Sequence, residues 1–311
     1  KIYAVKIMSN ILIIKHGSLG DLIQANGAME DIKASYKESK VLLLTSVHYM
    51  NLMSQCPYLD GVIQDKRKPR WNLLFLLNLK KLLNRYNFTH VYDLQNSSRT
   101  KFYKKFILKN PIWSSSESTL NKNEKKSDFD KYPVLKRFKM QLEKSGIQTK
   151  NIYQSNLSWA LIDINKQLHQ ITLGKYILIF PFCSKKHQNK KWPYYKKLIE
   201  KLKIIYSNKY SIIIAPGPNE VELSKEFNAK IFLDDNKPVN LNQLISLIQK
   251  SSFIVSNDTG PAHICKHLNK KGLVLFGSHT TARKVSIESE NFKSLTVKDL
   301  NDLKVEIVLD K

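Results

Sequence analysis

One octapeptide late in the chain, Ser256-Asn257-Asp258-Thr259-Gly260-Pro261-Ala262-His263, most constrains the fold. It follows Ser252-Phe253-Ile254-Val255, an apolar run short enough for a buried strand, and it precedes a helical pattern. Pro261 suits a first helical turn, and Gly260 lets a ligand approach the backbone. The octapeptide therefore predicts a strand, a sharp turn and a helix start whose N–H groups favour phosphate. An ordinary capped βα connection explains the same residues equally well.

A second strand–turn–helix pattern stands near the start of the chain. Residues 10–15 are an apolar run, His16-Gly17-Ser18-Leu19-Gly20-Asp21 is a glycine-bearing turn, and a helical pattern covers residues 22–33. Asp21 lies where a carboxylate also caps a helix well, so this turn alone is a weak signal. The pair is stronger, because one Asp-bearing turn opens each half of the chain.

Both halves alternate short apolar runs with helical segments, which predicts an α/β fold with parallel sheets covered by helices. Expected strands lie at 10–15, 41–45, 62–63, 89–93, 176–180, 211–215, 229–233, 252–255 and 272–276. Expected helices after the first lie at 133–145, 193–206, 219–227, 241–250 and 261–268. Residues 113–131 are polar and patternless, which predicts a mobile loop. Ligands in such folds bind beyond the carboxyl ends of the strands, where both Asp-bearing turns fall.

Composition limits the class of protein. A length of 311 residues with 42% hydrophobic residues fits two globular domains, which we place at residues 1–165 and 166–311. The formal net charge of +25 suggests nucleic acid or an anionic membrane as partner, but the lysines are spread along the chain, so we favour a general composition bias. The three cysteines form no C-x-x-C pair, as in a cytosolic protein with reduced thiols. We expect residues 1–7 to lie upstream of the natural start.

Four motifs, in this order, carry a resemblance to a known family. They are Leu19-Gly20-Asp21, Lys190-Lys191-Trp192-Pro193, Ile214-Ala215-Pro216-Gly217-Pro218-Asn219-Glu220 and Asp258-Thr259-Gly260-Pro261-Ala262-His263. The chain resembles glycosyltransferase family 9, the heptosyltransferases that build the inner core of lipopolysaccharide. The resemblance covers residues 10 to about 280, nearly the whole chain.

The resemblance implies a GT-B-type fold, in which two Rossmann-like domains with parallel sheets face each other across a cleft. The acceptor would bind the first domain and the nucleotide sugar the second, and residues 297–309 would form a helix that packs back on the first domain. The implied activity is an inverting, metal-independent transfer of a heptose from ADP-heptose, or a similar nucleotide sugar, to a lipopolysaccharide inner-core acceptor. We expect no cofactor and no nucleic-acid partner, and a cytoplasmic monomer in peripheral contact with the inner membrane.

Sugar transfer needs a base for the acceptor hydroxyl and positive charge on the departing diphosphate. Asp21 is the candidate base, with a purely structural helix cap as its alternative. Lys190 is the candidate for the diphosphate, and Lys191 is its rival. On the acceptor side, Ser18, Leu19 and Gly20 form the turn that presents Asp21.

The donor residues follow from the family motifs. Thr259 and Gly260 would offer N–H groups to the phosphates, and Asp258 would hold a sugar hydroxyl. His263 is expected to be a structural hydrogen-bonding group rather than a catalyst. Gly217 and Glu220 would border the nucleotide, with Glu220 on a ribose hydroxyl. Ser184 is a further candidate phosphate contact, although Phe182 stands where the family often has a small segment containing glycine.

No His, Cys and Asp cluster has metal-ligand spacing, so we expect no metal site. Asp128-Phe129-Asp130 has the form of a metal-binding D-x-D, but no strand precedes it and we interpret it as chance. Lys66-Arg67-Lys68-Pro69-Arg70, followed by Trp71 and the leucine-rich residues 73–83, looks like a basic amphipathic segment for anionic lipid. A core-packing helix with a basic flank is its alternative.

Two other functions stay open at this point. A GT-B relative that epimerises or hydrolyses nucleotide sugars would keep the donor site without using an acceptor. A basic nucleic-acid-binding protein would explain the net charge but not the two Asp-bearing turns.

Overall fold

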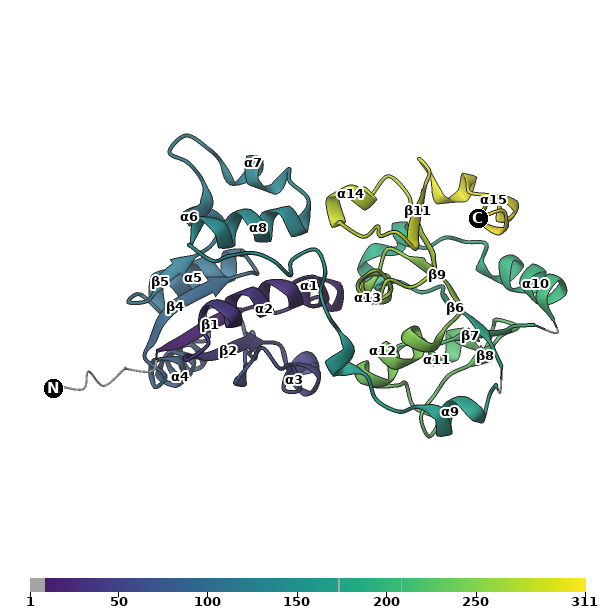
Figure 1. The fold of residues 1–311 in the computed structure, drawn as a ribbon, viewed down its shortest axis with the longest axis horizontal. Helices are drawn as coiled ribbons and strands as arrows, with labels where there is room; N and C mark the ends of the chain where they lie inside the picture. Colours follow the sequence, from purple (N-terminus) through teal and green to yellow (C-terminus); the bar gives the residue numbers. More distant parts are fainter. Residues whose placement is uncertain (1–8, 173, 208) are drawn as a thin grey trace. The chain divides into compact units, whose positions relative to one another are not determined.

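The computed structural model describes residues 9–172, 174–207 and 209–311, so the expectation about residues 1–7 lies outside them. The chain divides into two compact units, Lys1–Trp159 and Ala160–Lys311, which we call the N-terminal and C-terminal domains (Figure 1). The division falls a little before the boundary placed at residues 165 and 166. Each unit is a parallel sheet with helices, and the predicted α/β class is confirmed.

The N-terminal domain is built on a five-stranded parallel sheet in the order β3-β2-β1-β4-β5. Its central strands are apolar on both faces, as in β1, where Ile11, Leu12, Ile13 and Ile14 are fully buried. The strands are β1 Asn10–Ile14, β2 Lys40–Thr45, β3 Gly61–Gln64, β4 Phe88–Asp93 and β5 Ile112–Ser114.

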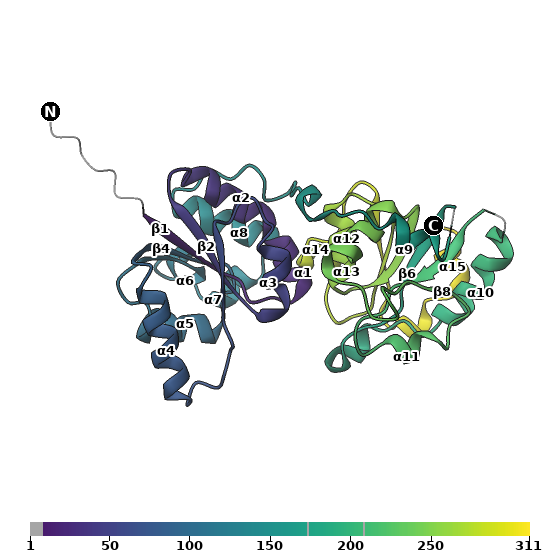
Figure 2. The same cartoon turned by 90° about the horizontal axis from the view of Figure 1, so that it is seen from below.

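Helices cover both faces of this sheet. Helices α4 and α5 pack on one face through a core that includes Leu79 and Tyr103, and α2 and α8 lie together on the other face (Figure 2). The helices are α1 Leu19–Gln24, α2 Asn26–Ser35, α3 Val47–Met53, α4 Leu73–Asn84, α5 Ser98–Phe106, α6 Ser116–Thr119, α7 Lys126–Asp130 and α8 Val134–Lys144.

The C-terminal domain has a six-stranded parallel sheet in the order β11-β10-β9-β6-β7-β8. The strands are β6 Tyr176–Phe180, β7 Ser211–Ile214, β8 Lys230–Ile231, β9 Phe253–Asn257, β10 Gly272–Phe276 and β11 Phe292–Thr296. The helices are α9 Asn165–His169, α10 Tyr195–Tyr206, α11 Val221–Ser224, α12 Leu241–Lys250, α13 Gly260–His267, α14 Ala282–Val285 and α15 Val305–Leu309. Short 3₁₀ helices are η1 Ser158–Ala160, η2 Lys185–Lys190 and η3 Leu300–Asp302.

Both sheets have the Rossmann strand order. Numbered from its own first strand, each domain begins 3-2-1-4-5, and the C-terminal domain adds a sixth strand. The order reverses between β1 and β4 in one domain and between β6 and β9 in the other. Ligands of such sheets bind at this switch point, beyond the carboxyl ends of the strands. The turns after β1 and β9 therefore lie where a ligand is expected in each domain.

The prediction of a mobile loop at residues 113–131 is wrong. This stretch contains the end of β5 and the helices α6 and α7. Trp113 and Phe129 are buried and fix its two ends to the domain, but they stand too far apart to give a periodic pattern. Within α7, Asp128 pairs with Lys131 at 2.7 Å and Asp130 with Lys126 at 2.6 Å, so the D-x-D carboxylates already have cationic partners.

The closing segment also differs from expectation. Residues 297–309 are not one helix but η3 followed by α15. Val305 and Val308 of α15 belong to the core of the C-terminal domain, where α15 contacts α10. The longest helices among the described residues, α4 and α10, have 12 residues each. No helix of the described residues is long and apolar enough to span a membrane.

Candidate functional site

Three basic side chains of the C-terminal domain lie around the Asp258 carboxylate, from the segment after β6, from α13 and from the loop after β10. Lys190 Nζ lies 2.6 Å from Asp258 Oδ2 and 3.4 Å from the Asp258 carbonyl oxygen. His279 Nε2 lies 3.2 Å from the same Oδ2, and His263 Nε2 lies 3.9 Å from Oδ1. The Asp258 side chain is only 3% exposed, whereas that of Lys190 is 24% exposed. One buried carboxylate thus holds a lysine whose side chain is partly exposed.

Asn257 and Trp192 connect the segment that carries Lys190 to the Asp258 turn through buried hydrogen bonds. The Asn257 side-chain oxygen accepts from the backbone N–H of Trp192 at 3.1 Å and from the Tyr195 hydroxyl at 3.2 Å. Trp192 is fully buried, and its indole N–H donates to the Leu303 carbonyl at 2.8 Å. The Trp-Pro motif therefore anchors the loop after β6 so that Lys190 faces Asp258, while Lys191 is exposed.

Helix α13 begins directly after Asp258. Thr259 is its N-cap in extended conformation, Gly260 is its first residue and Pro261 follows. Because the first N–H groups of a helix have no partner within it, they and the helix dipole create positive potential beside Lys190. The strand–turn–helix predicted from the octapeptide is present as expected.

Gly217 and Glu220 lie beyond β7, the neighbour of β6 in the sheet. The Gly217 N–H donates to Glu220 Oε2 at 2.8 Å. Burial raises the pKa of Glu220, and this hydrogen bond opposes the rise. Ser184 caps η2 and is exposed, so these three residues lie on loops at the carboxyl edge of the same sheet.

Asp21 is held by its own turn. Its Oδ2 accepts from the Ser18 N–H at 2.9 Å and from the Ser18 hydroxyl at 3.1 Å, which forms a capping box at the start of α1. Gly17 has φ +106°, a conformation that strains other residues, and an added Cβ there would clash with the Tyr49 ring. The turn therefore fixes the orientation of the carboxylate. The N-cap of α1 is Ser18 rather than Asp21, which is the third residue of the helix and accepts from the N-cap.

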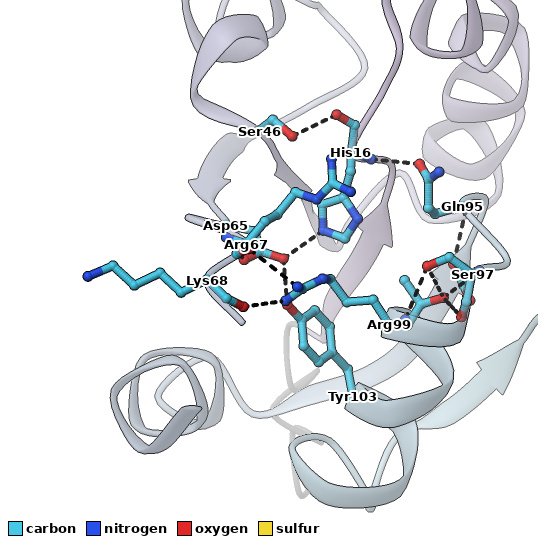
Figure 3. Close-up of polar contacts among 11 residues, drawn as sticks. His16, Ser46, Asp65, Arg67, Lys68, Gln95, Ser97, Arg99 and Tyr103 are labelled. Carbon is cyan, nitrogen blue, oxygen red and sulfur yellow. Dashed lines mark hydrogen bonds and ion pairs between the residues drawn. The ribbon is translucent and has the colours of Figure 1, made fainter. Parts of the chain in front are cut away.

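A buried network joins this turn to the basic loop after β3, as Figure 3 shows. His16 Nε2 lies 2.8 Å from Asp65 Oδ2, and both side chains are at most 1% exposed. The Tyr103 hydroxyl donates to Asp65 at 2.7 Å, and the Arg67 N–H donates to it at 2.7 Å. Burial alone would raise the pKa of Asp65, but His16, Tyr103 and the Arg67 N–H outweigh it and hold this pKa below its usual range.

Arg99 on α5 holds the basic loop from the other side. Its guanidinium donates to the Lys68 carbonyl at 3.1 Å, to the Arg67 carbonyl at 3.3 Å and to the Tyr103 hydroxyl at 3.1 Å (Figure 3). Because the backbone of residues 67 and 68 is held, their cationic side chains are presented from a fixed base.

Lys15 is a buried cation at the switch point of the N-terminal sheet. Its Nζ donates to the Leu94 carbonyl at 3.0 Å. Burial lowers the pKa of Lys15, while the charges of Asp21 and Asp93 raise it. Asp93 ends β4, and burial raises its pKa against the hydrogen bond from Thr100. Lys15 and Asp93 are thus both buried, and the charge of each acts on the pKa of the other.

Several of these residues were not predicted from the sequence. Asn257 stood inside the quoted octapeptide but was assigned no role, and Lys15 directly preceded the quoted turn. Asp65 and Arg99 belong to no motif, and no signal in the sequence marked them. His279 was not singled out either, although its position just after the expected strand 272–276 places it at a strand end. Among the described residues, no group of three or more His, Cys, Asp or Glu side chains has an arrangement that would hold a metal ion.

Comparisons with known proteins show the family and the fold. A family model, glycosyltransferase family 9 (heptosyltransferase), matches residues 76–302. The chain is 24% identical over 300 residues to lipopolysaccharide heptosyltransferase 1 of Campylobacter coli, covering 88% of this chain and 85% of that protein.

Solved structures share the fold. A family 9 glycosyl transferase from Veillonella parvula DSM 2008 has a TM-score of 0.78 at 15% identity, covering 97% of this chain and 95% of that one. The E. coli heptosyltransferase WaaC with ADP-2-deoxy-2-fluoro heptose has a TM-score of 0.70 at 16% identity, covering 97% and 98%.

The protein is therefore a glycosyltransferase with two Rossmann-like domains of GT-B type. It belongs to glycosyltransferase family 9, the heptosyltransferase family, because the family model covers well over half of the chain. The resemblance stated from the four motifs is confirmed.

Proposed function

We propose that this enzyme transfers a heptose from ADP-heptose, or a similar nucleotide sugar, to an anionic lipid-linked acceptor of the lipopolysaccharide inner core. The observation that carries the proposal is the Lys190–Asp258 pair at the switch point, beside the first N–H groups of α13. The Campylobacter coli relative is named a lipopolysaccharide heptosyltransferase, and the E. coli neighbour holds an ADP-heptose analogue, which supports this choice of donor.

On the donor side, Lys190 neutralises the departing diphosphate, and Thr259 and Gly260 bind it through N–H groups. Asp258 holds a sugar hydroxyl and orients Lys190. His263 supports the Asp258 carboxylate as a structural partner. Gly217, Glu220 and Ser184 border the nucleotide, and Glu220 accepts from a ribose hydroxyl.

On the acceptor side, Asp21 is the general base. It removes the proton from the acceptor hydroxyl as that oxygen attacks the anomeric carbon and the diphosphate leaves from the opposite face. This single displacement inverts the anomeric configuration. The two hydrogen bonds from Ser18 orient the carboxylate in advance, and Leu19 and Gly20 complete the turn.

The reaction as proposed needs no metal, because Lys190 and the α13 N-terminus supply the positive charge that the leaving diphosphate requires. Turnover should therefore persist in excess EDTA. Loss of activity with the chelator, restored by an added divalent cation, would overturn this part of the proposal.

In this proposal, a surface of the N-terminal domain binds the membrane that carries the acceptor. Leu76, Leu79 and Leu83 of α4 belong to the core, which agrees with the core-helix alternative. The other side of the same helix exposes apolar side chains: Leu73 and Leu74 are 70% exposed and Leu77 is 64% exposed. Trp71, which precedes the helix, is 83% exposed. Lys66, Arg67, Lys68 and Arg70 are exposed next to them. Such a patch fits an anionic lipid surface, where each basic residue contributes about 1 kcal/mol.

Vesicle sedimentation tests this surface. Vesicles with about a third anionic phospholipid should bind the protein at low salt and release it as salt rises. The variant Trp71→Ser, Leu74→Ser should bind less, whereas the control Ile204→Ser, Ile205→Ser, which alters exposed apolar residues of α10, should bind like wild type. Equal binding by both variants would contradict the proposed surface.

Ligand-induced thermal stabilisation tests the donor site. ADP and ADP-sugars should raise the melting temperature of the protein more than UDP, GDP and their sugars. A larger shift with UDP or GDP would contradict the proposed nucleotide.

A further inference from the structure

His279 reaches the Asp258 carboxylate from the loop after β10, outside every family motif quoted above. Its Nε2 lies 3.2 Å from Asp258 Oδ2, the oxygen that also binds Lys190. The ring is 5% exposed and stacks on Phe276, with centroids 5.7 Å apart and an interplanar angle of 14°. The stacking and burial leave the ring little freedom, so Nε2 stays directed at the carboxylate.

The surroundings of His279 favour a neutral ring at pH 7. Burial lowers its pKa, the hydrogen bond with Asp258 raises it, and the positive charge of Lys190 lowers it again. The groups that face the ring are Lys190 and His187 from the loop after β6 and Asp258 from the turn after β9, with His263 of α13 on the far carboxylate oxygen. Nδ1 of His279 has no hydrogen-bond partner among the described residues.

We propose that His279 is a positioning residue that takes up a proton when a nucleoside diphosphate binds, a proposal that rests on the donor site proposed above. The bound diphosphate shares the positive charge of Lys190 with Asp258, so the negative charge of the buried Asp258 carboxylate is less well compensated. A proton from solvent then binds Nδ1 of His279, and the resulting imidazolium keeps Asp258 paired through Nε2–H. Asp258 thereby stays in place while Lys190 serves the diphosphate.

A linked proton makes the affinity depend on pH. Since the complex holds one more proton than the free protein, ADP should bind more tightly as pH falls from about 8, until the free protein also binds that proton. The terminal phosphate of ADP itself titrates near pH 6, so the contribution of His279 must be measured by difference between variants.

The experiment is calorimetric titration of the full chain with ADP at pH 6.5, in two buffers of different ionisation enthalpy. The buffer dependence of the heat gives the number of protons bound. His279→Gln keeps a donor for Asp258 but does not titrate, so it should retain wild-type affinity at pH 8 and show a smaller proton uptake at pH 6.5. His279→Ala loses the donor as well and should bind ADP about tenfold more weakly at pH 8.

The matched control is His169→Gln, an exposed histidine on α9 of the same domain, which should behave as wild type. Thermal unfolding of each variant checks that it is folded. Absence of ADP binding by the wild type would overturn the proposed donor site and this inference together. ADP binding with the same proton uptake in His279→Gln as in wild type would overturn this inference alone.

Discussion

The two Asp-bearing turns share one layout but hold their carboxylates by different means. Asp21 accepts two hydrogen bonds from Ser18, three residues earlier in its own turn. Asp258 is bound by Lys190 and His279, which lie 68 and 21 residues away in sequence. The first carboxylate is oriented locally, whereas the second depends on loops that meet only in the folded domain.

Because they are held differently, the two carboxylates are suited to different roles. A carboxylate oriented by the N–H and hydroxyl of a serine in its own turn is suited to accept a proton from a substrate, which is the role proposed for Asp21. A carboxylate bound to a lysine is suited to hold that lysine for an anionic ligand, which is the role proposed for Asp258. Variants that affect one role and not the other test the division directly.

Asp21→Asn should have the largest effect. It should lower kcat by about a hundredfold or more, because the acceptor hydroxyl loses its base. The Kd for ADP should not change, since the donor residues belong to the other domain, and an Asn oxygen can still accept from Ser18. Turnover and calorimetry on the same preparation measure both quantities. Asp128→Asn in α7 is the control, and an Asp21→Asn enzyme within about threefold of wild type would contradict the assigned base.

Lys190→Met comes next. It should lower kcat/KM by about 10² to 10³ and weaken ADP binding, because the diphosphate loses a preorganised charge. Lys191→Met is the matched control, since Lys191 is exposed and Lys190 makes the contact with Asp258. Steady-state kinetics of the pair decides between the two lysines. An equal loss in both variants would show that the net charge of the segment, rather than the Lys190 contact, is what matters.

Asn257→Ala tests the long-range assembly of the second turn. The substitution leaves the buried backbone N–H of Trp192 and the Tyr195 hydroxyl without their acceptor, which should lower the free energy of unfolding by about 2–4 kcal/mol. Urea unfolding measures this cost. Asn242→Ala, which removes one buried hydrogen bond to Ala160, should cost about 1–2 kcal/mol. A smaller loss for Asn257 than for Asn242 would speak against Asn257 as the residue that locks the site.

Asp65→Asn should have the smallest effect and a defined pH dependence. Because the pKa of Asp65 is lower in the folded than in the unfolded protein, its ionised form stabilises the fold above the unfolded value near 4, and this contribution is lost as pH falls through the folded pKa. The stability gap between wild type and Asp65→Asn, about 1–2 kcal/mol at pH 7, should therefore shrink as pH falls from 5 to 3. A gap that is constant with pH would contradict an ionised Asp65 partner for His16 and Tyr103.

The sequence predicts much of the fold, because central parallel strands are continuous apolar runs. The bounds of β6 and β10 agree with expectation, and both turn motifs lie at strand ends as predicted. The short edge strands β5 and β11 were not predicted, since three to five residues with mixed burial give no clear pattern. Within residues 113–131, the two buried aromatic anchors are too few to produce a period.

The site was predictable only where its contacts are local or its motif is distinctive. The Ser18–Asp21 cap follows from a spacing of three residues. The pairing of Asp65 with Tyr103 spans 38 residues, and that of Asp258 with His279 spans 21, without any feature in the sequence that links the partners. Tertiary proximity of this kind is a property of the folded sheet edge, and spacing along the chain does not encode it visibly.

The most direct test of the account is the release of ADP from ADP-heptose by the wild-type protein, with and without a lipid-linked inner-core acceptor. If the proposed function is correct, release depends on the acceptor, and one sugar is transferred for each ADP. Rapid release without any acceptor would contradict it and would favour an enzyme that hydrolyses its donor.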